Sequence, residues 1–165
     1  MLRIVDITAP DINNGNGIRV TVWFAGCTHK CKGCHNSWTW NYNQGKDFIS
    51  EQDEILSAIS EWLNRYYVDG ITLSGGDPLD QQPQALEELE KLINWVRVNY
   101  PTKTIWCYTG YVYEELNEQQ KKIADKCDYL VDGPYKEELR DISNCPFRGS
   151  TNQRILDMIN HKQVQ

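Results

Sequence analysis

The sequence predicts an α/β fold built on a mostly parallel sheet. Strand-like and helix-like runs alternate along the chain, and no repeat or long linker interrupts its 165 residues. This alternation is typical of right-handed β-α-β crossovers. Because the chain has room for only four or five such units, too few for a closed eight-stranded barrel, we expect an open partial (β/α) barrel in one domain over residues 1–165.

The N-terminal part of the chain predicts two strands and a helix. β-Favouring apolar residues occupy 4–8 and 18–24, and the turn-rich segment 10–17 separates them. Ser50 and Asp53 have the spacing of a capping box, which predicts a helix start. The residues expected to share one face of this helix are Ile55, Ile59, Trp62, Leu63 and Tyr66.

The same rhythm continues to the end of the chain. Pro83 suits the first turn of a second helix, and Pro101 lies beyond its end. The predicted elements are a strand at 71–74, a helix with Leu86, Leu89, Ile93 and Val96 on its apolar face, a strand at 104–108, a polar helix at 114–126, a strand at 129–131 and a last strand within 152–159. Since the carboxyl ends of parallel strands gather at one edge of a sheet, we expect the ligand site among the loops that follow these strands.

Charge and cysteine usage exclude several classes of protein. Lys and Arg total 17 against 23 acidic residues, a net charge of -6 that argues against binding to nucleic acid. The first residues lack a signal-peptide pattern and no apolar run has membrane-spanning length, so we expect a cytoplasmic protein with reduced thiols and no membrane partner. Cys107 is expected in the core, and Cys127 and Cys145 are expected to be structural.

Three cysteines in one loop are the strongest chemical signal. Cys27, Cys31 and Cys34 follow the second predicted strand in C-x-x-x-C-x-x-C spacing. Iron-sulfur clusters normally use four thiolates, so a triplet leaves one iron without a protein ligand. Two alternatives compete: a structural zinc site with His29 or His35 as fourth ligand, and a redox pair formed by Cys31 and Cys34.

The cysteine triplet, together with a glycine-rich segment after the next strand, resembles the radical S-adenosylmethionine superfamily. That segment, Gly75-Gly76-Asp77-Pro78, has Asp where the superfamily more commonly has Glu. The resemblance implies a 4Fe-4S cluster held by the three cysteines, with its fourth iron chelated by the methionine amino and carboxylate groups of S-adenosylmethionine. It also implies reductive cleavage to a 5′-deoxyadenosyl radical, and an open partial barrel as the fold.

The resemblance further implies which residues contact S-adenosylmethionine. The segment from Gly75 to Pro78 would hydrogen-bond the methionyl ammonium, and residues around Cys34 would meet the adenine. Thr109 and Asp132, at later strand ends, would contact the ribose, the carboxylate or a bound cation. Plain turns and caps remain the alternative for the glycine segment and the strand ends. The implied cofactor-binding residues are Gly33, Cys34, His35, Asn36, Ser74, Gly75, Gly76, Asp77, Thr109 and Asp132.

Other segments resemble one branch of that superfamily, the activases of glycyl-radical enzymes that act on anaerobic ribonucleoside-triphosphate reductase. The matching segments are 14–19, 34–36, 108–111, 130–134 and 148–154. The implied substrate is a glycine of the reductase, and the implied electron donor is a protein such as reduced flavodoxin. A radical enzyme acting on a small molecule and a non-catalytic zinc-binding module remain as alternatives.

Several residues outside these motifs carry two interpretations. Arg148, Gln153 and Arg154 either dock a partner or structure the final loop. Most aromatic residues are expected in the core, whereas the loop residues Trp38, Trp40 and Tyr42 are expected to cover the cluster or to meet the partner.

Overall fold

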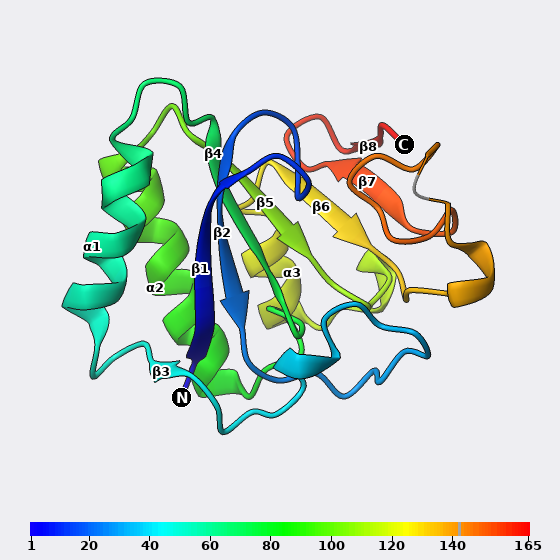
Figure 1. Cartoon of the computed structure of the whole chain (residues 1–165), viewed down its shortest axis with the longest axis horizontal. Coiled ribbons are helices and arrows are strands. Elements are labelled where there is room, and N and C mark those ends of the chain that lie inside the picture. The colour runs from blue at the N-terminus through cyan, green and yellow to red at the C-terminus, as the bar shows by residue number, and fades with distance from the viewer. Residues whose placement is uncertain (142) are drawn as a thin grey trace.

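All strands of the protein belong to a single sheet in the computed structural model, which describes residues 1–141 and 143–165. Across this eight-stranded sheet the order is β3-β1-β2-β4-β5-β6-β7-β8 (Figure 1). The strands are β1 (Arg3–Asp11), β2 (Arg19–Phe24), β3 (Lys46–Asp47), β4 (Gly70–Gly75), β5 (Thr104–Tyr108), β6 (Tyr129–Asp132), β7 (Arg154–Asp157) and β8 (Lys162–Gln163).

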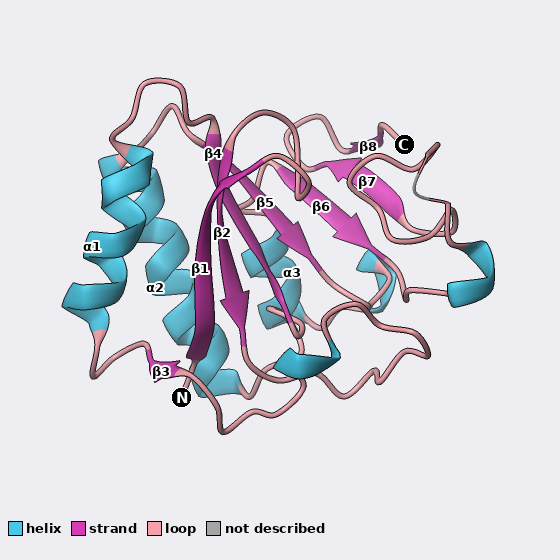
Figure 2. Cartoon of the chain, in the orientation of Figure 1, coloured by secondary structure: helices cyan, strands magenta, loops and turns pink. Residues whose placement is uncertain are grey.

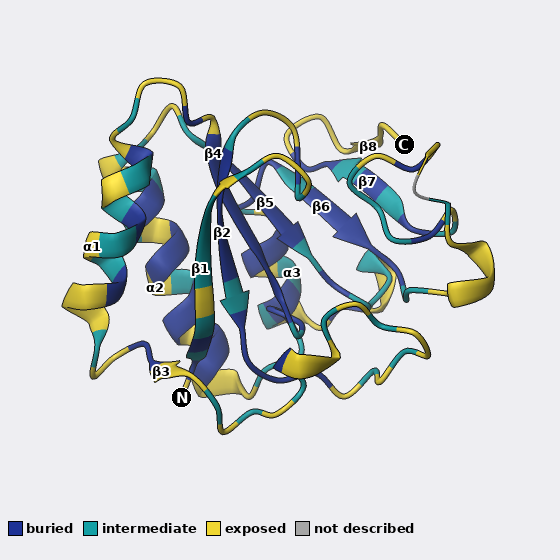
Figure 3. Cartoon of the chain, viewed as in Figure 1, coloured by how far each residue is buried: buried dark blue, intermediate teal, exposed yellow. Residues whose placement is uncertain are grey.

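Three α-helices cover one face of the sheet (Figure 2). They are α1 (Gln52–Leu63), α2 (Pro83–Asn99) and α3 (Glu118–Ala124), and short 3-10 helices lie at Ser37–Thr39, Tyr113–Glu115 and Glu137–Leu139. Each helix turns its buried side toward the strands (Figure 3). In the described part of the chain, no helix has both the length and the apolar composition needed to cross a bilayer.

The expectation of a mostly parallel sheet is wrong, because the sheet is mixed. Only the central strands β2, β4, β5 and β6 run parallel to one another. The outer pairs β1/β2, β1/β3, β6/β7 and β7/β8 are antiparallel. The physical reason lies in the connections: β1 and β2 are joined by a short turn segment without a crossover helix, and such a connection suits an antiparallel pair.

The predicted start and face of the first helix need correction. Helix α1 begins at Gln52 after an N-cap at Glu51, and no side chain caps it, so the Ser50/Asp53 capping box does not form. Ile55, Ile59 and Leu63 are buried in the core as expected, Trp62 is partly buried, but Tyr66 lies beyond the helix and is exposed. The apolar period is confirmed up to Leu63, and the helix ends before Tyr66.

The later elements agree closely with the sequence analysis. Helix α2 has Pro83 in its first turn, β5 spans the predicted residues, and β7 confirms a strand in the tail. The predicted 114–126 helix is shorter: α3 starts at Glu118, after a capping box formed by Asn117 and Gln120. Cys107, Cys127 and Cys145 are all buried.

Loops that follow the parallel strands meet at one edge of the sheet, as expected. The cysteine loop after β2, the glycine loop after β4 and the residues after β5 all leave the sheet at the edge to which these strands point (Figure 1). The sheet therefore brings together segments that are far apart in the sequence, and it places the candidate site at their junction.

Arg19 ties three central strands together from inside the protein. Its side chain is fully buried, and burial lowers the pKa of the guanidinium to about 10, so it stays charged at neutral pH. Its Nε donates to Thr72 Oγ1 at 2.7 Å, its Nη2 donates to Ile71 O at 2.7 Å and to Thr104 O at 2.9 Å, and its Nη1 donates to Asn16 O at 2.9 Å. These bonds join β2 to β4 and β5.

We expect the Arg19→Met substitution to lower the free energy of unfolding by about 2–4 kcal/mol, because several buried acceptors lose their donor. Arg65→Met is the matched control, since Arg65 lies on Trp62 at the protein surface and should contribute less than about 1 kcal/mol. Denaturant unfolding of the two variants checks this, and equal destabilisation would contradict the role given to Arg19.

Candidate functional site

The three cysteines of the loop face one small cavity. Cys27 is buried, Cys31 and Cys34 are partly exposed, and all three are free thiols. The loop closes on itself through a hydrogen bond from Cys34 N to Cys31 O at 3.2 Å. The cavity has a volume of about 120 Å³ and is lined by Cys27, His29, Cys31, Cys34, Asn36, Trp40, Ser74, Gly75, Gly76, Tyr108, Thr109, Gly110, Gly133, Tyr135 and Gln153.

The surroundings of the sulfur atoms suit thiolate ligands. Asn36 N donates to Cys34 Sγ at 3.4 Å, and the backbone of His29 and Lys30 donates to Cys27. Burial first, and the charge of Asp77 second, nevertheless raise the pKa of the Cys27 thiol to about 12. A metal that binds here must therefore displace protons, as thiolate-bound metals do. Three free sulfurs on one cavity, with N–H donors beside two of them, fit a cluster held by three thiolates.

The glycine loop packs closely on the backbone of β2 and of the cysteine loop. Gly75 has a φ of +110°, and a Cβ atom there would lie 2.3 Å from Phe24 N. A Cβ atom on Gly76 would lie 2.2 Å from Gly26 O, and Asp77 N donates to the same oxygen at 2.8 Å. Only glycine fits such contacts. The two glycines line the cavity, but the close approach that requires them is to protein backbone.

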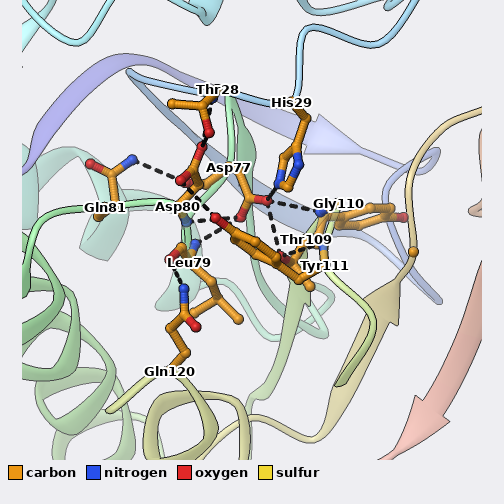
Figure 4. Close-up of polar contacts among 12 residues, drawn as sticks. Thr28, His29, Asp77, Leu79, Asp80, Gln81, Thr109, Gly110, Tyr111 and Gln120 are labelled. Carbon is orange, nitrogen blue, oxygen red and sulfur yellow. Dashed lines mark hydrogen bonds and ion pairs between the residues drawn. The ribbon is translucent and has the colours of Figure 1, made fainter. Parts of the chain in front are cut away.

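Asp77 points into the protein and not into the cavity. Its carboxylate is 1% exposed. Its Oδ2 lies 2.8 Å from His29 Nε2 and accepts from Thr109 Oγ1 at 3.0 Å and from Gly110 N at 2.8 Å, while its Oδ1 accepts from Leu79 N at 2.8 Å (Figure 4). Asp77 thus joins the glycine loop to the cysteine loop and to the end of β5.

Asp80 makes a second junction of the same kind, and sequence reasoning missed it. Its Oδ2 accepts from Thr28 N and Thr28 Oγ1, both at 2.6 Å, and its Oδ1 accepts from Tyr111 OH at 2.9 Å. The single hydroxyl proton of Tyr42 is shared between Asp80 O at 2.8 Å and Asp80 Oδ2 at 3.1 Å. Burial opposes ionisation, but these donors outweigh it and hold the pKa of Asp80 below its ordinary value. The only sequence signal was a second acid shortly after the glycine motif.

The ring of His29, one of the two histidines considered as a fourth zinc ligand, is hydrogen-bonded to Asp77. The hydrogen bond with Asp77 raises the pKa of His29 above its usual value, although burial opposes the rise. Its ring packs edge-on against Tyr111, with centroids 4.5 Å apart. His35, the other histidine of that alternative, lies elsewhere, 5.4 Å from the Tyr135 ring.

The structure brings most of the predicted site residues to the cavity. Cys34, Asn36, Ser74, Gly75, Gly76 and Thr109 line it together with Cys27 and Cys31. His35 instead lines an adjoining cavity of about 520 Å³, which shares a wall formed by Cys34, Asn36, Ser74, Tyr108, Tyr135 and Gln153. Gly33 packs against Glu137, where a Cβ atom would lie 2.6 Å from the carboxylate.

Asp132 is fully buried at the end of β6, next to Gly133 of the cavity wall. Arg154 Nε donates to its Oδ1 at 2.9 Å, and Tyr113 N donates to its Oδ2 at 2.8 Å. Arg154 also pairs with Glu114, and its pKa is raised by the two carboxylates, Asp132 first. Asp132 therefore fixes the chain after β6 against β7.

Hydrogen bonds in the final loop show which of its polar residues, expected either to dock a partner or to structure the loop, have the structural role. Gln153 Oε1 accepts from Gly149 N at 2.8 Å, and its Nε2 donates to Gly133 O at 3.0 Å, so Gln153 structures the loop, as Arg154 does. Arg148 donates to Gln153 O at 3.1 Å and also lines the larger cavity.

The aromatic residues of the cysteine loop have three different surroundings. Trp40 lines the small cavity, and the hydroxyl of Tyr42 donates to Asp80. Trp38 is 48% exposed and packs against Trp23, with ring centroids 6.0 Å apart. Only Trp40 therefore lies where a cluster cover is expected.

Comparison with known proteins agrees with this geometry. Residues 13–156 match the family described as "4Fe-4S single cluster domain", which favours iron and sulfide over zinc. The anaerobic ribonucleoside-triphosphate reductase-activating protein of Escherichia coli K12 is 42% identical over 146 residues, covering 88% of this chain and 92% of the relative. The protein of that name from Enterobacteria phage T4 is 39% identical, covering 88% of this chain and 87% of the relative.

A third relative with this name, from Haemophilus influenzae, is 40% identical over 147 residues, with coverage of 88% of this chain and 91% of the relative. Identity at this level extends across the cysteine loop, the glycine loop and most of the sheet. The chain therefore belongs to the family of anaerobic ribonucleoside-triphosphate reductase-activating proteins, and its residues 13–156 match a 4Fe-4S single cluster domain.

Proposed function

We propose that this chain, as one domain over residues 1–165, activates an anaerobic ribonucleoside-triphosphate reductase by forming a glycyl radical on it. The observation that carries the proposal is the single cavity formed by Cys27, Cys31 and Cys34 on one side and by Gly75 and Gly76 on the other. We infer the target from the names of the relatives and the cluster from the matching 4Fe-4S family. The parallel strands β2, β4, β5 and β6, with their helices on one face, are assigned as an open partial (β/α) barrel of the radical S-adenosylmethionine type.

The protein's own residues hold and shield the cofactors. Cys27, Cys31 and Cys34 would ligate three irons and leave the fourth for S-adenosylmethionine. When bound, the cluster and S-adenosylmethionine supply one-electron cleavage of the sulfonium and removal of the α-hydrogen of a glycine. Trp40 and Tyr108 on the cavity wall limit the access of water to that chemistry.

Polar groups on the cavity wall are assigned to S-adenosylmethionine. Ser74, Gly75 and Gly76 offer backbone groups for the methionyl end, and Asn36 and Thr109 lie on the same wall. We assign the adenine to the side of His35, which lines the adjoining cavity.

The remaining residues of the predicted set act through others. Asp77 is a positioning residue, because its carboxylate holds Thr109 and Gly110 at the wall and does not reach the cavity itself. Gly33 lets the cysteine loop pack closely on Glu137, and Asp132 holds the end of β6 to Arg154.

The larger adjoining cavity suits a macromolecular substrate. Its volume of about 520 Å³ exceeds that of the small cavity, and the two share a wall, so a chain segment of the reductase has room beside S-adenosylmethionine. A soluble electron donor such as reduced flavodoxin, acting in the cytoplasm, completes the proposed reaction. A small molecule is the alternative substrate.

We expect Cys31→Ala to lose nearly all iron and sulfide after anaerobic reconstitution, because the cluster loses one of its three protein ligands. The matched control is Cys127→Ala, which removes a buried thiol outside the loop and should cost about 1–2 kcal/mol of stability while keeping the cluster. Metal and sulfide analysis checks both variants. Stoichiometric zinc without iron in protein purified under anaerobic conditions would overturn the cluster assignment.

Mixing the reduced protein with S-adenosylmethionine and the anaerobic reductase should produce a glycyl radical, visible by electron paramagnetic resonance. The radical should require both S-adenosylmethionine and the intact cysteine triplet, since both are needed for the one-electron cleavage. Release of 5′-deoxyadenosine is measured in parallel. Cofactor cleavage without a radical on the reductase would point instead to the small-molecule alternative.

A further inference from the structure

Asp80 places a second carboxylate beside the cysteine ligands. The Sγ atom of Cys27, a ring nitrogen of His29 and a carboxylate oxygen of Asp80 all lie within 4.8 Å of one another. Asp80 follows the glycine loop and the other two belong to the cysteine loop, so this proximity exists only in the folded protein. Figure 4 shows Asp80 and His29 of this group.

The charge of Asp80 is not cancelled by its hydrogen-bond partners. Within residues 1–141 and 143–165, its donors are the neutral groups of Thr28, Tyr42 and Tyr111. His29 is the nearby titratable base, and its hydrogen bond goes to Asp77. Even with His29 protonated, the group of His29, Asp77 and Asp80 therefore carries one net negative charge.

A fixed negative charge next to a cluster ligand disfavours adding an electron to the cluster. The potential of an iron-sulfur cluster depends on local net charge, on hydrogen bonds to sulfur and on solvent exposure. Coulomb interactions across a few ångström are strong where the protein excludes water. Cys27 is 8% exposed and Asp80 is half-buried, so water screens this interaction less than it would between two charges at the protein surface.

We propose that Asp80 is a positioning residue with an electrostatic role: it clamps the cysteine loop to the glycine loop and lowers the reduction potential of the cluster bound at Cys27. A lower potential makes the reduced cluster a stronger donor toward the sulfonium of S-adenosylmethionine. The inference rests on the proposed cluster and on no property of the reductase.

The clamp and the charge of Asp80 can be separated because their loss is expected to change the reduction potential of the cluster in different ways. Asp80→Asn removes the charge and keeps one carbonyl acceptor, so the potential should rise. Tyr42→Phe removes one donor and keeps the charge, so it weakens the clamp while the potential stays unchanged or falls. The ring of Tyr42 packs on Gly26 and is retained in this variant.

The experiment is an anaerobic redox titration of the reconstituted full chain with dithionite, in which electron paramagnetic resonance follows the one-electron reduction of the cluster. In Asp80→Asn we expect the reduced-to-oxidised ratio at fixed potential to rise about tenfold, which is a shift of about 59 mV. An unchanged potential, or an equal rise in Tyr42→Phe, would show that Asp80 acts through packing alone.

A second pair of variants covers the case in which Asp80→Asn does not retain its cluster. Thr28 is exposed and adjacent to Asp80, so Thr28→Lys brings a cation to the carboxylate and should also raise the potential. Thr28→Met, of similar length but neutral, is the control and should show no rise. A rise in both variants, or in neither, contradicts the electrostatic role. Glycyl-radical formation with an unshifted potential would leave the proposed function standing and remove only this inference.

Discussion

Two carboxylates, the buried Asp77 and the half-buried Asp80, hold the candidate site together. Asp77 and Asp80 lie just after β4, and each accepts hydrogen bonds from segments that are far apart in the sequence. A buried carboxylate is costly unless donors surround it. The loops that supply those donors must therefore be in place together, which makes the cysteine loop, the glycine loop and the end of β5 one structural unit.

This junction also explains why glycines stand where the loops meet. A side chain on Gly76 would collide with the backbone at Gly26, and the two loops could not approach closely enough for Asp77 and Asp80 to reach their donors. Arg19 has a comparable role within the sheet, where its guanidinium joins β2, β4 and β5. The strands that carry the loops are thus fixed before any cofactor binds.

Local patterns in the sequence predicted the elements well, whereas the outer strand directions and the polar network were not foreseen. The central strands, α2 and the tail strand follow from periodicity and from prolines, which are local signals. The antiparallel pairing of β1 with β2 was foreseeable, because the turn between them is too short for a crossover.

The candidate site also contains some residues that local sequence patterns predict and others that they do not. The spacing of the cysteine triplet indicated a metal or cluster site, and the resemblance that includes the glycine segment favoured a cluster. The convergence of the two loops followed from the strand ends. The role of Asp80 depends on Thr28, Tyr42 and Tyr111, and the role of Asp132 depends on Arg154. Only the fold brings these partners together, so no local pattern revealed them.

The most direct test of the central claim asks whether S-adenosylmethionine binds the open iron of the cluster. The measurement is an electron-nuclear double resonance spectrum of the reduced protein with S-adenosylmethionine isotopically labelled at its amino nitrogen. The expected result is a nitrogen-15 hyperfine coupling to the cluster, which a nitrogen-14 signal replaces when unlabelled S-adenosylmethionine is used. An intact 4Fe-4S cluster that shows no such coupling at saturating S-adenosylmethionine would contradict the assignment of the cavity.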